Sequence, residues 1–92
     1  MPARLINEPI EVIAHFDDKG IHPLRFKWQE RAYIISYVSH NNTKNNEIFF
    51  HTKTKGDDTK TDYVLVFNTR DFTWELRLMQ RYEPGDDLEN NY

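Results

Sequence analysis

Apolar and polar side chains alternate one by one in segment after segment of this 92-residue chain. A period of two is typical of β-strands, because successive side chains of a strand point to opposite sides. No stretch shows a convincing helical period. The sequence therefore predicts an all-β protein, with strands expected at 10–16, 24–28, 31–40, 47–50, 63–67 and 72–82.

Short polar segments separate these strands. Gln29-Glu30 is a two-residue turn candidate, and 17–20, 56–58 and 68–71 also have turn composition. Residues 41–46 contain no apolar side chain and are expected to form a loop. Six short antiparallel strands, several with apolar residues on both faces, favour closure into a small six-stranded antiparallel barrel or a strongly curved sheet.

The predicted core is small and rich in aromatic residues. A chain of this length buries only about 60–65% of its unfolded surface, so the aromatic share of 14% matters for packing. The side chains expected to build the core are Val12, Phe16, Leu24, Phe26, Trp28, Tyr33, Ile35, Leu65, Phe67, Trp74 and Leu76.

Charge divides the chain into a body and a tail. Residues 1–82 are expected to form one β domain, and 83–92 an acidic, flexible C-terminal tail. The tail holds four of the fifteen acidic residues and none of the twelve basic ones, so the body has 12 basic and 11 acidic residues, a charge of +1. A second hypothesis makes the tail an arm that masks a basic face.

The residue types give little support for catalysis. There is no cysteine, the two serines lie in or beside a predicted strand, and the three glycines are isolated turn formers. We therefore expect no enzyme and no cofactor. Without a long apolar segment or a secretory signal, we expect a cytoplasmic protein.

One group of possible metal ligands stands out near the first turn. Imidazole and carboxylate groups gather at His15, Asp17, Asp18 and His22. This spacing matches no closed zinc pattern, and aspartates in a turn commonly bond the backbone instead. No metal site is predicted, although a ligand role for His15 or His22 stays open.

Basic residues supply the candidate binding site. Small barrels bind nucleic acid through basic grooves and aromatic stacking. Our first hypothesis is a non-catalytic module that contacts nucleic acid through Arg25, Lys27, Arg31 and Arg77. The alternative is a protein-interaction or assembly module, as a homodimer or an accessory subunit, that uses an exposed strand edge or an aromatic patch.

The stretch PLRFKWQERAYII carries a family resemblance. It is similar to the pattern P-x-x-F-x-W-x-x-R-x-Y-x-V of a small β-rich bacterial family of unknown function, and the matching positions are Pro23, Phe26, Trp28, Arg31, Tyr33 and Ile35. The resemblance covers about residues 7–82. Similar segments are appended to proteins that resemble Y-family DNA polymerases. It implies a small β domain with an accessory role near DNA metabolism, although residues 39–46 depart from the family's pattern.

Overall fold

The computed structural model describes residues 3–56 and 61–81, which form seven β-strands and no helix. The strands are β1 (Ala3–Pro9), β2 (Glu11–Asp17), β3 (Gly20–Trp28), β4 (Arg31–Lys44), β5 (Glu47–Thr54), β6 (Thr61–Asn68) and β7 (Thr73–Arg81). Within these residues no helix is therefore available to cross a membrane. The predicted all-β class is confirmed. The predicted tail and part of the turn at 56–58 lie outside the described residues.

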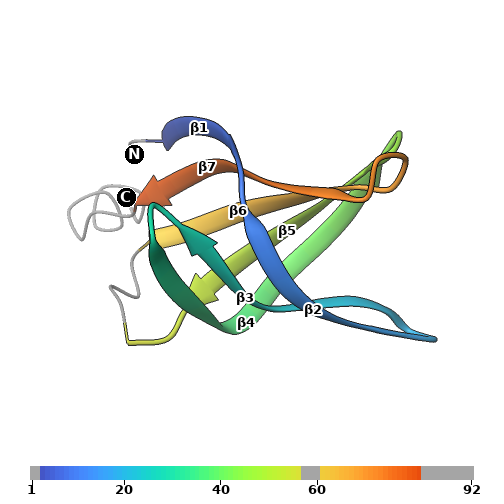
Figure 1. Cartoon of the computed structure of the whole chain (residues 1–92), viewed down its shortest axis with the longest axis horizontal. Helices are drawn as coiled ribbons and strands as arrows, with labels where there is room; N and C mark the ends of the chain where they lie inside the picture. Colours follow the sequence, from blue (N-terminus) through green and yellow to red (C-terminus); the bar gives the residue numbers. More distant parts are fainter. Residues whose placement is uncertain (1–2, 57–60, 82–92) are drawn as a thin grey trace, which may run out of the picture.

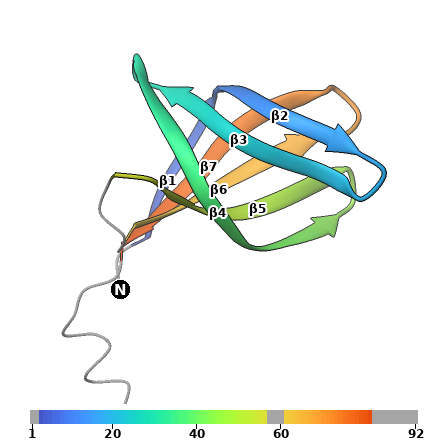
Figure 2. The same cartoon turned by 90° about the horizontal axis from the view of Figure 1, so that it is seen from below.

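All seven strands belong to one antiparallel sheet in the order β1-β7-β6-β5-β4-β3-β2 (Figure 1). The two edge strands, β1 and β2, are separated in the chain by Ile10 alone, whose N–H donates to the Trp74 carbonyl at 3.2 Å. The sheet must therefore curl until its edges meet at this residue. In Figure 2 β2 and β3 accordingly cross over β5, β6 and β7. No ladder joins β1 to β2, so the sheet is strongly curved but not closed.

The sequence missed β1, and the predicted number of six strands was one too few. Apolar Leu5 and Ile6 are adjacent instead of alternating, so the segment shows no period of two. The structure explains the broken pattern by a register shift against β7 between Leu5 and Glu8, where Asn7 takes a positive φ of 53°.

β4 is curved by two bulges that lie at Ser36 and Ser39. Each serine hydroxyl donates at 3.1 Å to a β5 carbonyl, that of Lys53 or of His51. These bonds satisfy the carbonyls where the backbone ladder is interrupted. The strand then continues to Lys44, so the predicted loop at 41–46 was wrong. Its polar residues pair through the backbone, which requires no apolar side chain, and only Asn45-Asn46 form the turn.

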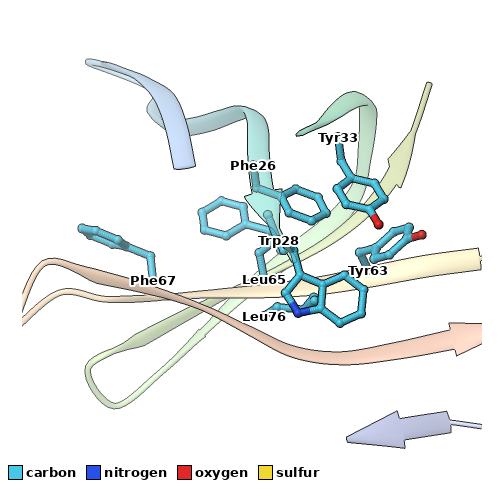
Figure 3. Close-up of a cluster of buried hydrophobic side chains, with 8 residues drawn as sticks. Phe26, Trp28, Tyr33, Tyr63, Leu65, Phe67 and Leu76 are labelled. Carbon is cyan, nitrogen blue, oxygen red and sulfur yellow. The ribbon is translucent and has the colours of Figure 1, made fainter. Parts of the chain in front are cut away.

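The curled sheet has two crossing walls, one made of β2, β3 and the start of β4, and the other of β5, β6 and β7. The core is an aromatic cluster between these walls (Figure 3). The Tyr33 ring stacks on Phe26 at 4.9 Å and lies 5.5 Å from Tyr63. The buried members are Phe26, Trp28, Tyr33, Phe50, Tyr63, Leu65, Phe67 and Leu76. Six of the predicted core residues are therefore buried, and Val12, Ile35 and Trp74 pack against them half-buried.

Two predicted core residues, Phe16 and Leu24, are exposed, by 58% and 49%. Leu24 is the extra residue of a bulge in β3, since Ile13 pairs with Arg25 and Ala14 pairs with Pro23. The bulge inverts the alternation, so Pro23 is buried in its place. Phe16 lies near the tip of the β2–β3 hairpin, where its ring contacts Phe67 edge-on at 6.0 Å.

The tight turn between β3 and β4 agrees with the sequence prediction. Gln29 and Glu30 both have positive φ, 52° and 63°, as a two-residue type I′ hairpin turn requires. Trp28 follows the inward parity, and its indole N–H donates to the Glu8 carboxylate at 3.0 Å. This bond links β3 to β1, next to the point where the sheet edges meet.

Candidate binding face

The outward side chains of β2, β3 and the start of β4 form a continuous surface, here called the β2–β4 face. Its members are Glu11, Ile13, Leu24, Arg25, Lys27, Ala32 and Ile34. The strand register places them in rows, because directly opposed residues of neighbouring strands point to the same side. Ile13, Arg25 and Ile34 form one such row across the three strands, and Glu11, Lys27 and Ala32 form the next.

Large aliphatic groups are exposed on this face. Ile13 is 54% exposed and Ile34 is 51% exposed, and the two flank the Arg25 position on the central strand. A groove of about 280 Å³ lies between β2 and β3, lined mainly by this face, with Val12 and Phe26 as its remaining wall residues. The β2–β4 face thus combines exposed aliphatic side chains and a groove with two cations on its central strand.

A second hollow continues from the groove toward the meeting point of the sheet edges. It has a volume of about 370 Å³ and shares Glu11 and Lys27 with the first. Pro9, Ile10 and the Gln29-Glu30 turn complete its lining. Together the two hollows extend from Ile13 past the start of β2 to Pro9, an elongated shape that suits an extended chain better than a compact ligand.

The structure brings together two of the four basic residues predicted to form the binding site. Arg25 and Lys27 lie two positions apart on β3, both exposed and on the same face. Arg31 instead pairs with Trp28, so it lies on the opposite parity. Its guanidinium carbon is 5.0 Å from the Tyr33 ring centre, a cation–π contact at the border of the core.

Arg77, the fourth predicted residue, lies on a different wall and is already neutralised. Its guanidinium donates to Glu47 at 2.8 Å and to Glu75 at 3.0 Å, and it lies 5.5 Å from the Phe49 ring centre. The hydrogen bond to Glu75, with a smaller contribution from Glu47, raises the Arg77 pKa above its ordinary value. Because its charge is shared by two carboxylates, this residue has little left for a phosphate.

The charge of the β2–β4 face is modest. It combines two cations with one carboxylate, Glu11, which is directly opposite Lys27. High affinity for a nucleic-acid backbone generally requires several phosphate contacts. Two cations among exposed aliphatic side chains instead suit a ligand that is partly acidic and partly apolar.

His15 and His22, whose ligand role the sequence left open, lie near the tip of the β2–β3 hairpin. His22 Nε2 is 3.0 Å from Asp17 Oδ1, and His15 Nε2 is 3.8 Å from Asp17 Oδ2. The bond to His22, followed by the Lys19 N–H, lowers the Asp17 pKa. Among the described residues, no group of three or more His, Cys, Asp or Glu side chains could hold a metal ion.

A second pair of histidines was missed by the sequence analysis. His40 and His51 are directly opposed on β4 and β5, and their rings stack at 3.9 Å. Partial burial, then the proximity of His40, lowers the His51 pKa. The pairing depends on the two serine bulges in β4, which no periodicity in the sequence reveals.

Comparison with known proteins gives no match: no family model, curated protein or solved structure corresponds to this chain.

Proposed function

We propose that this protein is a cytoplasmic, non-catalytic protein-binding module whose β2–β4 face binds an extended, acidic and apolar segment of a partner protein. The observation that carries this proposal is the row Ile13–Arg25–Ile34. It presents one guanidinium between two half-exposed isoleucines, above a groove. The resemblance to domains associated with DNA polymerases is compatible with such an accessory role.

Apolar burial would supply much of the binding free energy. Ile13, Leu24 and Ile34 are each about half exposed on the same face. Covering apolar surface stabilises a complex by roughly 25 cal/mol per Å² before the cost of association is subtracted. Clustered aliphatic surface of this kind is typical of an interaction site, whereas scattered exposed residues would need no explanation.

The cations would select the charge of the partner. Arg25 forms a planar, five-donor fork that binds carboxylates well, and Lys27 adds a second positive charge beside it. Glu11 opposes only one of them directly. An aspartate or glutamate among apolar residues of a partner segment would therefore complement the face. A nucleic-acid strand would leave the isoleucines without partners.

Selection from a random peptide display library tests this proposal on the full chain. We expect enriched peptides to combine acidic and aliphatic residues. We also expect their affinity to fall about tenfold for Arg25→Glu. Arg70→Glu, an exposed arginine in the β6–β7 turn, is the matched control and should bind normally.

Anisotropy with labelled single- and double-stranded oligonucleotides, at low and physiological salt, provides the opposing measurement. Salt-sensitive oligonucleotide binding that Arg25→Glu abolishes, without peptide enrichment, would replace the proposal by the nucleic-acid hypothesis. Peptides that bind Arg25→Glu as well as wild type would place the site elsewhere.

A further inference from the structure

The two edges of the sheet differ in how well they are protected against pairing with another chain. The β1 edge carries Arg4, a bulge between Leu5 and Glu8, and Pro9, all features that discourage strand addition. β2 has the sequence EVIAHFD, with no proline, lysine or arginine. The bulge beside it belongs to β3, so β2 itself stays regular. Within the described residues, β3 is the only strand that pairs with β2.

The free edge of β2 has a defined pattern of backbone groups. Asp17 pairs with Gly20 across a two-residue turn, which directs the Asp17 backbone groups toward β3. Alternation then turns Val12, Ala14 and Phe16 away from β3. Ile10 has the same phase, and its N–H indeed donates outward, to Trp74. Three residues of β2 therefore offer their backbone groups to an added strand.

We propose that a second copy of this chain pairs antiparallel with this edge, β2 against β2, about a two-fold axis at Ile13. Val12 would then pair with Ala14 of the second copy, and the two Ile13 residues would face one another. Glu11 would lie opposite His15 of the second copy, at both symmetry-related positions. The contact is isologous and closes at two copies.

Backbone phase and charge select this register. A shift by one residue would oppose backbone groups of unlike phase, so only even shifts keep the ladder. Two allowed registers are neighbours of this one. The register centred on Ala14 would oppose Glu11 to Asp17 of the second copy, twice. The register centred on Val12 would pair Ala14 with Ile10, whose N–H already donates to Trp74. Like charges directly opposed are destabilising, whereas the Ile13-centred register opposes a carboxylate to an imidazole.

The proposed contact would cover side chains that one copy leaves exposed. Ile13 is 54% exposed and would pack against its symmetry mate. Phe16, 58% exposed, would lie opposite Ile10 of the second copy. The two β2–β4 faces would become one continuous surface. Their Arg25 side chains would then be separated by about three strand spacings, roughly 14 Å, which is beyond the Debye length at physiological salt.

Sedimentation equilibrium of the full chain, over a roughly hundredfold range of concentration, tests the association. We expect a reversible rise in mass from 11.1 kDa to twice that value. Ile13→Lys should keep the protein monomeric, because the substitution would place one lysine of each copy directly opposite the other at the two-fold axis. Leu5→Lys introduces the same charge at a 69%-exposed residue of the β1 edge and should leave the association unchanged.

A charge exchange tests the register with substitutions that leave the core intact. Glu11→Lys and His15→Glu should each weaken association, by about tenfold for His15→Glu, and the double variant should restore it. A protein that stays monomeric throughout would overturn the proposal. A dimer that is disrupted by Leu5→Lys but not by Ile13→Lys would also overturn it. The same holds if the Glu11→Lys and His15→Glu single variants and the double variant all have the same dissociation constant for the dimer. None of these results depends on whether the β2–β4 face binds a peptide.

Discussion

The outer faces of the two walls of this sheet differ in how far their aliphatic side chains are exposed to solvent. On the β2–β4 face the isoleucines of the flanking strands are half exposed. On the outer face of β5, β6 and β7, Val64 and Val66 are only 3% and 2% exposed, although they point away from the core residues Tyr63, Leu65 and Phe67. Both walls alternate as strands should, yet the aliphatic side chains on the outer side of β6 are covered and those on the β2–β4 face are not. The wall of β5, β6 and β7 is here called the sealed wall, and the wall that carries the β2–β4 face the unsealed wall.

The difference lies in which strand carries the long side chains. Val66 is flanked by Phe49 and Glu75, and Val64 by His51 and Leu78, so long residues of the outer strands cover short ones in the middle. On the β2–β4 face the order is reversed: the long cation lies on the central strand and the branched residues lie on either side. Strand alternation alone therefore does not decide burial, and the unsealed wall is the one available to a partner.

The largest expected contrast between a buried and an exposed position comes from the same substitution in each wall. Leu65→Ala removes a side chain that is fully buried opposite Leu76, and should lower the free energy of unfolding by about 3 kcal/mol. Leu24→Ala, in the exposed bulge of β3, should change it by less than about 0.5 kcal/mol. Urea unfolding followed by tryptophan fluorescence measures both. Equal losses would mean that Leu24 packs in the core after all.

A smaller contrast is expected for the two arginines. Arg77→Gln leaves Glu47 and Glu75 without their shared cation over Phe49, and should destabilise the fold by about 1 kcal/mol, less at high salt. Arg25→Gln should leave stability unchanged while weakening peptide binding. Unfolding at low and high salt measures the first effect. A salt-independent loss at Arg77 would point to packing of its aliphatic stem instead.

The sequence was sufficient to predict the fold class and most of the core because strand alternation is a local signal. The prediction from sequence was wrong where the alternation is interrupted. The β3 bulge exchanged Leu24 for Pro23, and the irregularity in β1 concealed a whole strand. Bulges depend on the partner strand as much as on the residue itself, so periodicity in one segment cannot locate them.

The candidate site was predictable only in part, for a related reason. Arg25 and Lys27 share a face because they are two residues apart on one strand, which the sequence shows directly. Arg31 is separated from them by the Gln29-Glu30 turn, and its parity follows from the register that this turn imposes. Neutralisation of Arg77 requires Glu47, thirty residues away in the chain, and only the tertiary structure brings the two together.

The smallest expected effect concerns the pH dependence of the sealed wall. Because burial and His40 lower the His51 pKa, the unfolded state binds more protons than the folded state between the folded pKa and the ordinary value of 6.5. The free energy of unfolding should therefore rise with pH through that window. Equivalently, the protein should lose stability as the pH is lowered from about 6.5 toward the folded-state pKa. Asp62, on β6, acts in the opposite direction and raises the His51 pKa.

His51→Asn should flatten this slope, which urea unfolding at several values between about pH 5 and pH 7.5 would show. His40→Asn is the graded control. It removes the repulsion between the rings and only the part of the His51 burial that the stacked His40 ring provides, so the slope should decrease but persist. If both variants keep the wild-type slope, other groups produce the pH dependence. If His40→Asn abolishes the slope as completely as His51→Asn does, the stacked His40 ring contributes more to the His51 shift than the rest of its surroundings.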